Sequence, residues 1–537
     1  MPPPTAPLPT RRDALTTRLA ATAEFDLLVV GGGATGLGVA LDAAVRGFSV
    51  ALLEGEDFAK GTSSRATKLV HGGVRYLAQG KLSLVREALH ERAALLRNAP
   101  HLASPIGFVM PAYRWWESRF YGAGLALYDR LAGRDALGRT RRLDRAATLA
   151  ELPGVRAEGL RGGVLYWDGQ FDDARLAVAL ARTAAAHGAL LLNHVEAIGL
   201  LHEDGRVRGV RALDRETGEA RDVRARAVVN ATGVWVDALR SHDGAANGRD
   251  VAPIVAPSQG VHLVVDRAFL PGGRALLVPA TADGRVLFAV PWLGRTLLGT
   301  TDTPREDLAD EPEPFADEVA FVLREAARYL ARAPTRADVT SAWVGLRPLV
   351  RASGESAADT KALSREHTVT TSPSGLVSVT GGKWTTYRAM AEDVLERCAD
   401  AGLIERRPGG ATATLRLAGA PAPGGSAPGQ GPAPPIAAPP GPHLYGSDAP
   451  ALDALPGADR MLAEGLTEAM VRFAARHEWA RTVEDVLARR SRLLFLDAAA
   501  ADAVAPRVAA LMREETGADP RLGVFRDLAR RYRTLPA

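Results

Sequence analysis

The sequence contains a single cysteine and very few lysines. Cys398 has no partner in the chain, so no internal disulfide can form and no cysteine cluster can bind a metal, which fits a reducing cytosol. Of the 66 basic residues only five are lysine, and these are Lys60, Lys68, Lys81, Lys361 and Lys383. Because almost all other cations are arginine, each compact ammonium group is a candidate for a specific role.

The chain also lacks a long hydrophobic run and a stretch of charge of one sign. Its longest uncharged apolar run, residues 27–41, is too short to span a membrane, and residues 1–24 lack the apolar segment of a secretory signal. We therefore expect a disordered leader over 1–24, a protein that stays on the side where it was made, and only peripheral membrane contact. The net charge of +4 is spread along the chain, which indicates no nucleic-acid partner and is compatible with an anionic membrane face or substrate.

The sequence does contain a dinucleotide-binding unit over residues 25–54. A short apolar strand runs into Gly31, Gly33 and Gly36 at the spacing that allows a tight turn, a close approach to pyrophosphate and close packing of helix on strand. A second strand ends at Glu54, near the position where an acid holds a ribose diol. The acid favours an unphosphorylated ribose, and therefore FAD or NAD rather than NADP.

The remaining sequence predicts an α/β fold with a Rossmann-like domain that carries an inserted sheet. The nucleotide-binding segments are expected at about 25–110, 170–240 and 375–400, with a helix from Asp172 and a β-meander over 195–223. Short β patterns over about 250–375, with one helix at 317–330, predict a mixed or antiparallel substrate-binding sheet. This region, 25–406, precedes a Pro/Ala/Gly-rich linker over 407–442 and a C-terminal helical domain over 443–537.

Four motifs carry a resemblance to a known family. They are VGGGATGLGVALDAAVRG, GTSSRATKLVHGGVRYL from Gly61, GLRPL from Gly345 and GGKWTTYRAMA from Gly381. Together they resemble the FAD-dependent glycerol-3-phosphate dehydrogenases over about residues 25–400, and HEWARTVEDVLARRSRLLFLD from His477 is similar to the C-terminal domain of that family. The chain departs from the family at Leu37, where relatives usually have a small residue, and in the linker around 420–440.

The resemblance implies an FAD site built from several loops. Hydroxyls and glycine amides suit the acceptors of the pyrophosphate and the pyrimidine edge. The implied contacts are Thr62, Ser63, Ser64, Lys68, His71, Gly72, Gly73, Thr232, Gly233, Gly381, Gly382, Lys383 and Thr385. Attachment of FAD is expected to be non-covalent because no residue stands out as a linking group, although His71 is the one histidine near the expected ring.

Oxidising a secondary alcohol requires a hydride acceptor, a base and an anchor for the substrate. Flavin N5 is a suitable acceptor, and arginine suits a phosphate because its planar fork pairs with two oxygens at once. Arg347 and Arg365 match the phosphate-site arginines of the family, and Arg75-Tyr76 matches another substrate-site pair. For each arginine the alternative is an ordinary surface charge.

His262 is the leading candidate for the general base, since an imidazole near its reference pKa can accept a proton at neutral pH. The alternative is a buried core histidine. The family uses Lys383 at the active site, where a cation can stabilise negative charge on the ring or hold the substrate. Asp302 is expected to orient His262 or a substrate hydroxyl, or else to cap a turn.

The leading hypothesis is a flavoenzyme that oxidises glycerol 3-phosphate to dihydroxyacetone phosphate and passes electrons to a membrane quinone. Its expected location is the cytoplasm, at the inner face of the cell membrane. The alternatives are an oxidase that uses oxygen, an enzyme for another 2-hydroxy acid or an amino acid, and a non-catalytic FAD-binding or assembly protein. The sequence leaves open whether the chain forms a homodimer.

Overall fold

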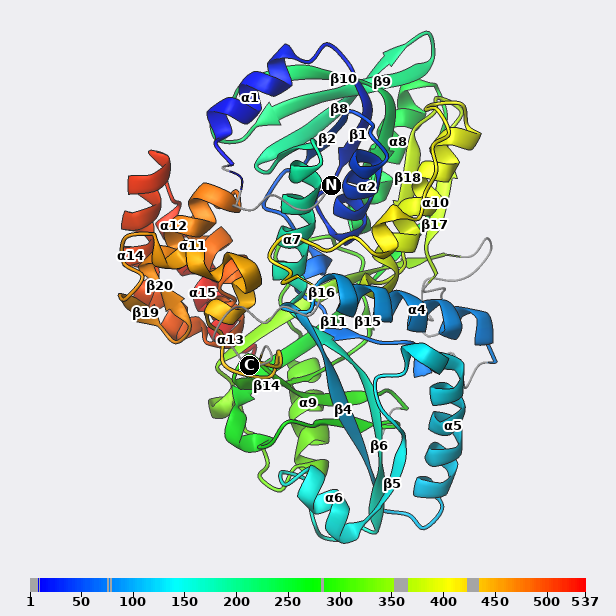
Figure 1. The fold of residues 1–537 in the computed structure, drawn as a ribbon, viewed down its shortest axis with the longest axis vertical. Helices are drawn as coiled ribbons and strands as arrows, with labels where there is room; N and C mark the ends of the chain where they lie inside the picture. The colour runs from blue at the N-terminus through cyan, green and yellow to red at the C-terminus, as the bar shows by residue number, and fades with distance from the viewer. Residues whose placement is uncertain are drawn as a thin grey trace.

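The computed structural model describes residues 8, 10–74, 77, 80–281, 284–351, 366–422 and 434–537. Its core consists of two large β-sheets, and the C-terminal helices lie against one side of the molecule (Figure 1). The chain passes between the sheets several times, so the residues of the site come from distant parts of the sequence.

The first sheet carries the dinucleotide-binding unit. β1 (Phe25–Val30) lies parallel to β2 (Val50–Leu53) on one side and to β10 (Ala220–Asn230) on the other. The strand order is β17-β18-β10-β1-β2-β7, where β17 is Thr368–Thr371, β18 is Val377–Thr380 and β7 is Leu190–Leu192. Apolar side chains fill both faces of β1 and β2, as parallel strands covered on both sides require.

Helices and a meander cover the two faces of this sheet. α2 (Ala34–Val45) packs between α7 (Asp173–Ala186) and α10 (Tyr387–Asp400). β8 (Val195–Glu203), β9 (Arg206–Asp214) and β10 form an antiparallel meander, which confirms the prediction for 195–223. α8 (Val236–Ala246) follows β10.

The second sheet has ten strands and is mixed, which confirms the predicted class. The strand order is β15 (Thr303–Pro304), β11 (Val255–Asp266), β14 (Arg295–Gly299), β13 (Leu287–Trp292), β12 (Ala275–Val278), β4 (Ala103–Ala112), β6 (Gly162–Phe171) and β3 (Leu69–Val70). β16 (Ser341–Val350) pairs with β11, and β5 (Arg141–Asp144) pairs with β6. α9 (Ala316–Tyr329) packs against β11 and β13 and matches the helix predicted at 317–330.

The sequence interpretation missed how much of this sheet precedes residue 250. It placed residues up to about 110 in the nucleotide-binding part, whereas β4 pairs with β6 and β12 of the second sheet. The sequence does not predict β6 because this strand is buried on both faces and mixes glycine, aspartate and aromatic residues. It therefore shows no alternation of polar and apolar side chains. α4 (Leu82–Asn98), α5 (Glu117–Ala132) and α6 (Arg145–Glu151) connect these strands.

The described parts of the expected leader and linker pack against the rest of the chain. α1 (Arg12–Ala21) buries Leu19 in the core under the meander, and Thr10 N donates to Arg476 O at 2.8 Å, so residues 10–24 differ from the predicted disordered leader. In the linker, Leu417 and Ile436 are buried and bond to the backbone of the second-sheet region. A segment without regular secondary structure can still bury isolated apolar side chains, which a composition argument does not reveal.

The C-terminal region is helical, as predicted. It contains α11 (Ala449–Asp453), α12 (Glu468–His477), α13 (Leu493–Leu496), α14 (Ala498–Thr516) and α15 (Leu522–Arg533). α13 packs on the second sheet, where the Ser341 hydroxyl donates to Leu494 O at 2.8 Å. None of the helices in the described part of the chain has both the length and the apolar character that crossing a membrane needs.

Candidate active site

A cavity of about 1570 Å³ lies where the two sheets meet. Val30, Leu53 and Val379 line it from the first sheet, while His262, Phe288 and Tyr166 line it from the second. This volume exceeds the range typical of a site for one small ligand, so there is room for a dinucleotide together with a small substrate.

The glycines of the first βα turn make the backbone approach that a pyrophosphate needs. Gly31 has φ +106°, and a Cβ there would lie 2.6 Å from Ala231 O. A Cβ on Gly36 would fall far inside contact distance of Gly31 O, so the helix packs against the turn only because this residue has no side chain. A Cβ on Gly33, which lines the cavity at the start of α2, would lie 3.0 Å from the Ser63 hydroxyl.

The N-terminus of α2 faces this turn without a side-chain cap from its own N-cap residue, Gly33. Ser63 supplies one partner from elsewhere, because its hydroxyl accepts from Ala34 N at 2.9 Å. The first N–H groups of a helix have no intrahelical acceptor and carry the positive end of the helix dipole. The turn is therefore suited to a phosphate group.

Glu54 stands at the end of β2 and lines the cavity. Its two carboxylate oxygens accept from Gly32 N at 2.6 Å and from Glu56 N at 2.9 Å, so the side chain also holds the glycine-rich turn in place. Burial raises the pKa of this carboxyl, against the effect of the two backbone hydrogen bonds.

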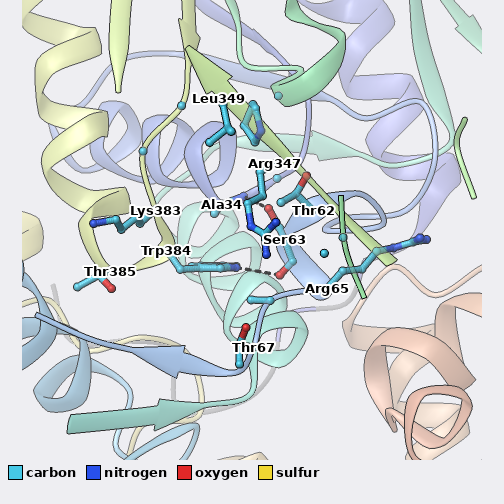
Figure 2. A pocket seen from close by; sticks show the side chains of 18 of the residues that line it. Ala34, Thr62, Ser63, Arg65, Thr67, Arg347, Leu349, Lys383, Trp384 and Thr385 are labelled. Atoms are coloured by element: carbon cyan, nitrogen blue, oxygen red, sulfur yellow. Dashed lines mark hydrogen bonds between the residues drawn. The ribbon is translucent and has the colours of Figure 1, made fainter. Parts of the chain in front are cut away.

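The segment 61–68 crosses the cavity beside the second sheet. Thr62 donates to Leu346 O at 2.5 Å, and Trp384 Nε1 donates to Ser63 O at 2.8 Å, the bond drawn in Figure 2. The Trp384 bond joins this segment to the Gly381-Gly382 turn, where both glycines have positive φ, +79° and +75°. Thr385, in the short helix that follows, donates to His71 O at 3.4 Å. Two loops distant in sequence, 61–71 and 381–385, therefore meet strand β16 at one wall of the cavity.

His262 lies on β11 with its imidazole almost fully buried. Its Nε2 lies 2.9 Å from the Thr67 hydroxyl, and its ring stacks on Trp343 with centroids 5.5 Å apart. Burial, together with the nearby charges of Lys68 and Arg347, lowers the pKa of His262 well below its ordinary value. The residue is therefore neutral at physiological pH and able to accept a proton.

Arg347 lies on β16, where it pairs with Ser258 of the neighbouring strand β11. Its guanidinium donates to Gln259 O at 3.2 Å, to the Thr300 hydroxyl at 3.2 Å and to Thr301 O at 2.9 Å. It lies over Gly260, where a Cβ would collide with it. Part of the side chain stays exposed to the cavity, so a fixed guanidinium is presented there.

Asp302 belongs to this arginine rather than to the histidine. Its Oδ1 lies 3.3 Å from Arg347 Nη1 and accepts from the Ser258 hydroxyl, whereas His262 Nε2 is held by Thr67. The expectation that Asp302 orients His262 therefore does not match the structure. His262 pairs with Gly299, the last residue of β14, whereas Asp302 comes after Thr300, beyond the end of that strand.

The structure brings most of the other implied residues to the cavity. Besides those already described, the lining includes His71, Gly73, Thr232, Gly233, Gly381, Gly382, Lys383 and Thr385. Figure 2 shows the Lys383 side chain pointing away from Arg347. Arg75, Tyr76 and Arg365 lie outside the described residues.

Three implied contacts do not line the cavity. Lys68 is buried behind its wall, where the ammonium donates to Asp173 at 2.7 Å, and Ser64 is buried beside it. Gly72 N donates to the Tyr128 hydroxyl at 2.8 Å, and a Cβ on this glycine would collide with Tyr128 and Leu89. These residues support the loops from behind, a role that the motif alone does not distinguish from direct contact.

Sequence reasoning missed Thr67, Thr300 and Gly260. Thr67 lies inside the motif that begins at Gly61, but its partner His262 is 195 residues away, and no spacing rule connects them. Thr300 and Gly260 support Arg347 through the pairing of β11 with its neighbours. A signal for Gly260 existed in the strand sequence, since an isolated glycine within a strand marks a close approach.

Comparisons with known proteins agree with this arrangement. Residues 26–388 match the model of the family described as FAD dependent oxidoreductase, and residues 443–521 match the C-terminal domain of alpha-glycerophosphate oxidase. The chain is 40% identical to the mitochondrial glycerol-3-phosphate dehydrogenase of Bos taurus, over 95% of this chain and 73% of that protein. It is 40% identical to the Arabidopsis thaliana protein of that name, over 95% and 86%.

A solved structure is similar over nearly the whole chain. The glycerol-3-phosphate dehydrogenase from Bacillus halodurans, complexed with FAD, has a TM-score of 0.76 and 30% identity, over 97% of this chain and 98% of that one. Glycine oxidase from Geobacillus kaustophilus shares the fold of 72% of the chain, with a TM-score of 0.51.

The matching model and the geometry define the chain as a flavin-dependent oxidoreductase with FAD as its cofactor. Within that class it belongs to the family of FAD-dependent glycerol-3-phosphate dehydrogenases. The residues present fit FAD, because the glycine turn leaves no Cβ in the way, the α2 N-terminus suits a pyrophosphate, and the cavity extends from there to His262.

Proposed function

We propose that the enzyme oxidises sn-glycerol 3-phosphate to dihydroxyacetone phosphate. The observation that carries the proposal is that the Arg347 guanidinium and the neutral His262 imidazole contact two adjacent residues, Thr300 and Gly299. Arg347 bonds to the Thr300 hydroxyl, while the His262 ring packs against Gly299, where a Cβ would lie 2.7 Å from its Cδ2. A three-carbon substrate is short enough to place its phosphate at the first group and its hydroxyl at the second.

Each residue has a defined task in this reaction. Arg347 binds the phosphate dianion. Its own side chain is already held by Asp302, Gln259 and Thr301, so it loses little conformational entropy when the substrate binds. His262 accepts the hydroxyl proton, and Thr67 fixes the plane of its ring. FAD, when bound, supplies the acceptor for the hydride that leaves C2. Its attachment is proposed to be non-covalent.

Substrate discrimination tests this proposal. Purified protein with FAD is incubated with glycerol 3-phosphate, glycerol, lactate or glycine and an artificial electron acceptor. We expect dihydroxyacetone phosphate from glycerol 3-phosphate and turnover lower by at least about 100-fold with the others, because they lack the phosphate that pairs with Arg347. Equal turnover of lactate or glycine would overturn the substrate assignment.

We also propose that the electrons pass to a quinone dissolved in the membrane. α5 presents an apolar face to solvent, with Trp115 just before it and Phe120 and Leu127 within it exposed at 72%, 66% and 44%. Phe120 and Leu127 also line the cavity, so an apolar path leads from its interior to this face. An acceptor that lives in lipid needs such a path.

The charges around α5 support a membrane surface. Arg114, Arg119, Arg130 and Arg134 are exposed at or beside the helix. Apolar and aromatic side chains flanked by arginine are typical of helices that lie in the interface of an anionic membrane. α5 also lies at the edge of the molecule opposite the C-terminal helices (Figure 1). We propose peripheral attachment through this helix at the inner face of the cell membrane.

One observation favours an oxidase as the second candidate. The C-terminal region matches a domain described for alpha-glycerophosphate oxidase, whose name implies oxygen as acceptor. Oxygen is small and needs no apolar entrance. Peroxide measured during turnover in air, with and without a soluble quinone, separates the two: the quinone-linked enzyme forms little peroxide and is accelerated by the quinone.

A further inference from the structure

A group of fully buried charges lies behind the wall of the cavity. It consists of Lys68, Asp172, Asp173 and Arg492, and none of these side chains is exposed to solvent. We call this group the Asp173 cluster. Lys68 comes from the FAD-binding region and the two aspartates from the start of α7, but Arg492 comes from the C-terminal helical domain. The cluster therefore joins two domains at the back of the site.

Two cations of the Asp173 cluster converge on one backbone oxygen. Lys68 Nζ and Arg492 Nη2 each donate to Ser64 O at 2.7 Å. The same two groups bind opposite oxygens of Asp173, at 2.7 Å and 3.1 Å. Asp173 also accepts from Ala66 N at 3.1 Å. The segment 64–68 is thus fixed at its start, middle and end by the cluster.

The same segment carries two groups that act at the front of the wall. Ser63 caps α2 at the pyrophosphate turn, and Thr67 holds His262. A displacement of Ser64 O would move Ser63 on one side and Thr67 on the other. The placement of the base therefore depends on the cluster, whereas Arg347 is held by β11 and the turn after β14.

Aromatic rings provide a second connection to the C-terminal domain. The Lys68 ammonium lies 5.0 Å from the ring centroid of Trp292 and 5.4 Å from those of Trp343 and Phe495. Phe495, on α13, packs edge-on against Trp343 at 4.9 Å, and Trp343 stacks under the His262 ring. The C-terminal domain thus contacts the layer directly beneath the imidazole.

We propose that the C-terminal helical domain positions the catalytic base, with Arg492 and Phe495 as the positioning residues. Arg492 fixes the backbone that carries Thr67, and Phe495 fixes the ring on which His262 stacks. The inference rests on the proposed role of His262 as base. Neither residue is among those that line the cavity, so both act through the residues that they hold.

The charge balance explains why Arg492 is required for position rather than for packing alone. The Asp173 cluster contains two cations and two carboxylates. Without Arg492 a buried carboxylate loses half of its compensation, and one of the donors to Ser64 O is lost. Burial, and next to it the charge of Arg492, lowers the pKa of Lys68 to about 7 against the opposing effect of Asp173, so the four charges of the cluster depend on one another.

The test compares Arg492→Met with Arg472→Met in the FAD-loaded, full-length enzyme. Arg472 is a control in the same domain, because its ion pairs are with Glu514 and Glu515 of α14 and not with the Asp173 cluster. We expect Arg492→Met to lower kcat about 10- to 100-fold with little change in the KM for glycerol 3-phosphate, because the anchor Arg347 does not move. Arg492→Lys should recover part of kcat, and Arg472→Met should leave kcat unchanged.

Phe495→Leu provides a variant that keeps the charge cluster whole. It should lower kcat with unchanged KM and shift the acid limb of the kcat profile, because the ring under His262 is altered. Equal kcat in wild type, Arg492→Met and Phe495→Leu, or a parallel loss in Arg492→Met and Arg472→Met, would overturn the inference.

A structural readout keeps this test independent of turnover. Trypsin cleaves after Arg65 and Lys68, both buried in the structure, so the rate of cleavage there reports how firmly the segment is held. We expect faster cleavage at these two sites in Arg492→Met than in Arg472→Met. Unchanged cleavage would count against the inference. If the wild type fails to oxidise glycerol 3-phosphate, the proposed function is wrong, while the cleavage comparison still decides whether Arg492 fixes the segment.

Discussion

His262 shows how burial sets the protonation state of a side chain that the sequence identifies only by type. Its imidazole is buried and lies near two cations, Lys68 and Arg347, and all three influences oppose protonation. The same surroundings make the neutral form available over a wide range of pH. The imidazole is thus neutral at physiological pH, and Thr67 rather than a carboxylate supplies its orientation, as the proposed role of base requires.

The pH profile checks this state. Because the pKa of His262 is lowered well below 6.5, we expect kcat/KM for glycerol 3-phosphate to stay constant as the pH falls from 8 to 6.5 and to decline only at lower pH. His262→Asn should lower kcat by about 100- to 10,000-fold and leave FAD content unchanged. A decline centred at or above pH 6.5 would contradict a buried neutral base.

Gly36 offers a sharp test of the dinucleotide turn. A Cβ at this position would collide with Gly31 O, so Gly36→Ala must displace the turn from the helix. We expect protein purified with this substitution to contain little FAD, measured by the ratio of flavin to protein absorbance. Gly199→Ala is the control, since nothing lies within 4 Å of a Cβ there. Normal FAD content in Gly36→Ala would show that the turn tolerates the shift.

The candidate site could be predicted where residue type and local motif suffice. The glycines, Glu54, Ser63, His262 and Arg347 all line or shape the cavity. The partners of these residues could not be predicted, because pairs such as Thr67 with His262 and Asp302 with Arg347 arise only when distant strands meet. The burial of Lys68 behind the wall was missed for the same reason.

At the scale of helices and strands, the proposed membrane attachment depends on α5. Its buried face packs on β6 and α4, and its other face exposes Phe120 and Leu127 at the mouth of the cavity. Single exposed apolar residues are common on protein surfaces, but a cluster that is flanked by arginine indicates an interaction surface.

Binding to vesicles tests the role of α5. We expect the double variant Trp115→Ser, Phe120→Ser to bind vesicles with anionic lipid about 10-fold more weakly than wild type, since each side chain loses its apolar contact with lipid. Activity with a soluble acceptor should be retained. Val524→Ser, at an exposed position on α15, serves as the control. Equal sedimentation of all three proteins with vesicles would exclude α5 as the attachment surface.

Elements were predictable where their periodicity or apolar content is unbroken. β1, β2, α9 and the meander appeared as expected. β4 and β6 did not, because strands buried on both faces lack alternation, and the pairing of β4 with β12 joins segments far apart in the sequence. α1 was missed because its sequence is polar, with only Leu19 fully buried, so tertiary contacts stabilise it.

At the scale of the whole molecule, buried neutral histidines couple stability to pH. Burial lowers the pKa of His101 to about 3, and Arg175 and Arg182 act in the same direction. As the pH falls below 6.5 the unfolded chain binds a proton at this residue and the folded chain does not. Protons therefore favour unfolding, and the free energy of unfolding falls as the pH is lowered from 6.5 towards 3.

Urea unfolding measures this coupling. Between pH 7 and pH 5, His101 should lower the free energy of unfolding by about 2 kcal/mol, so His101→Gln should show a smaller decrease than wild type by about that amount. Wild type and His101→Gln with the same dependence on pH would show that the folded protein protonates this histidine.

The proposed reaction depends above all on Arg347, which is expected to anchor the phosphate of a substrate whose oxidation reduces bound FAD. Anaerobic titration with glycerol 3-phosphate, followed through the loss of flavin absorbance, tests it most directly. We predict that glycerol 3-phosphate bleaches the wild-type flavin. Arg347→Ala should retain its FAD but need a substrate concentration at least about 100-fold higher for the same bleaching. Loss of FAD from Arg347→Ala with unchanged substrate affinity, or no bleaching of the wild type, would contradict this role of Arg347.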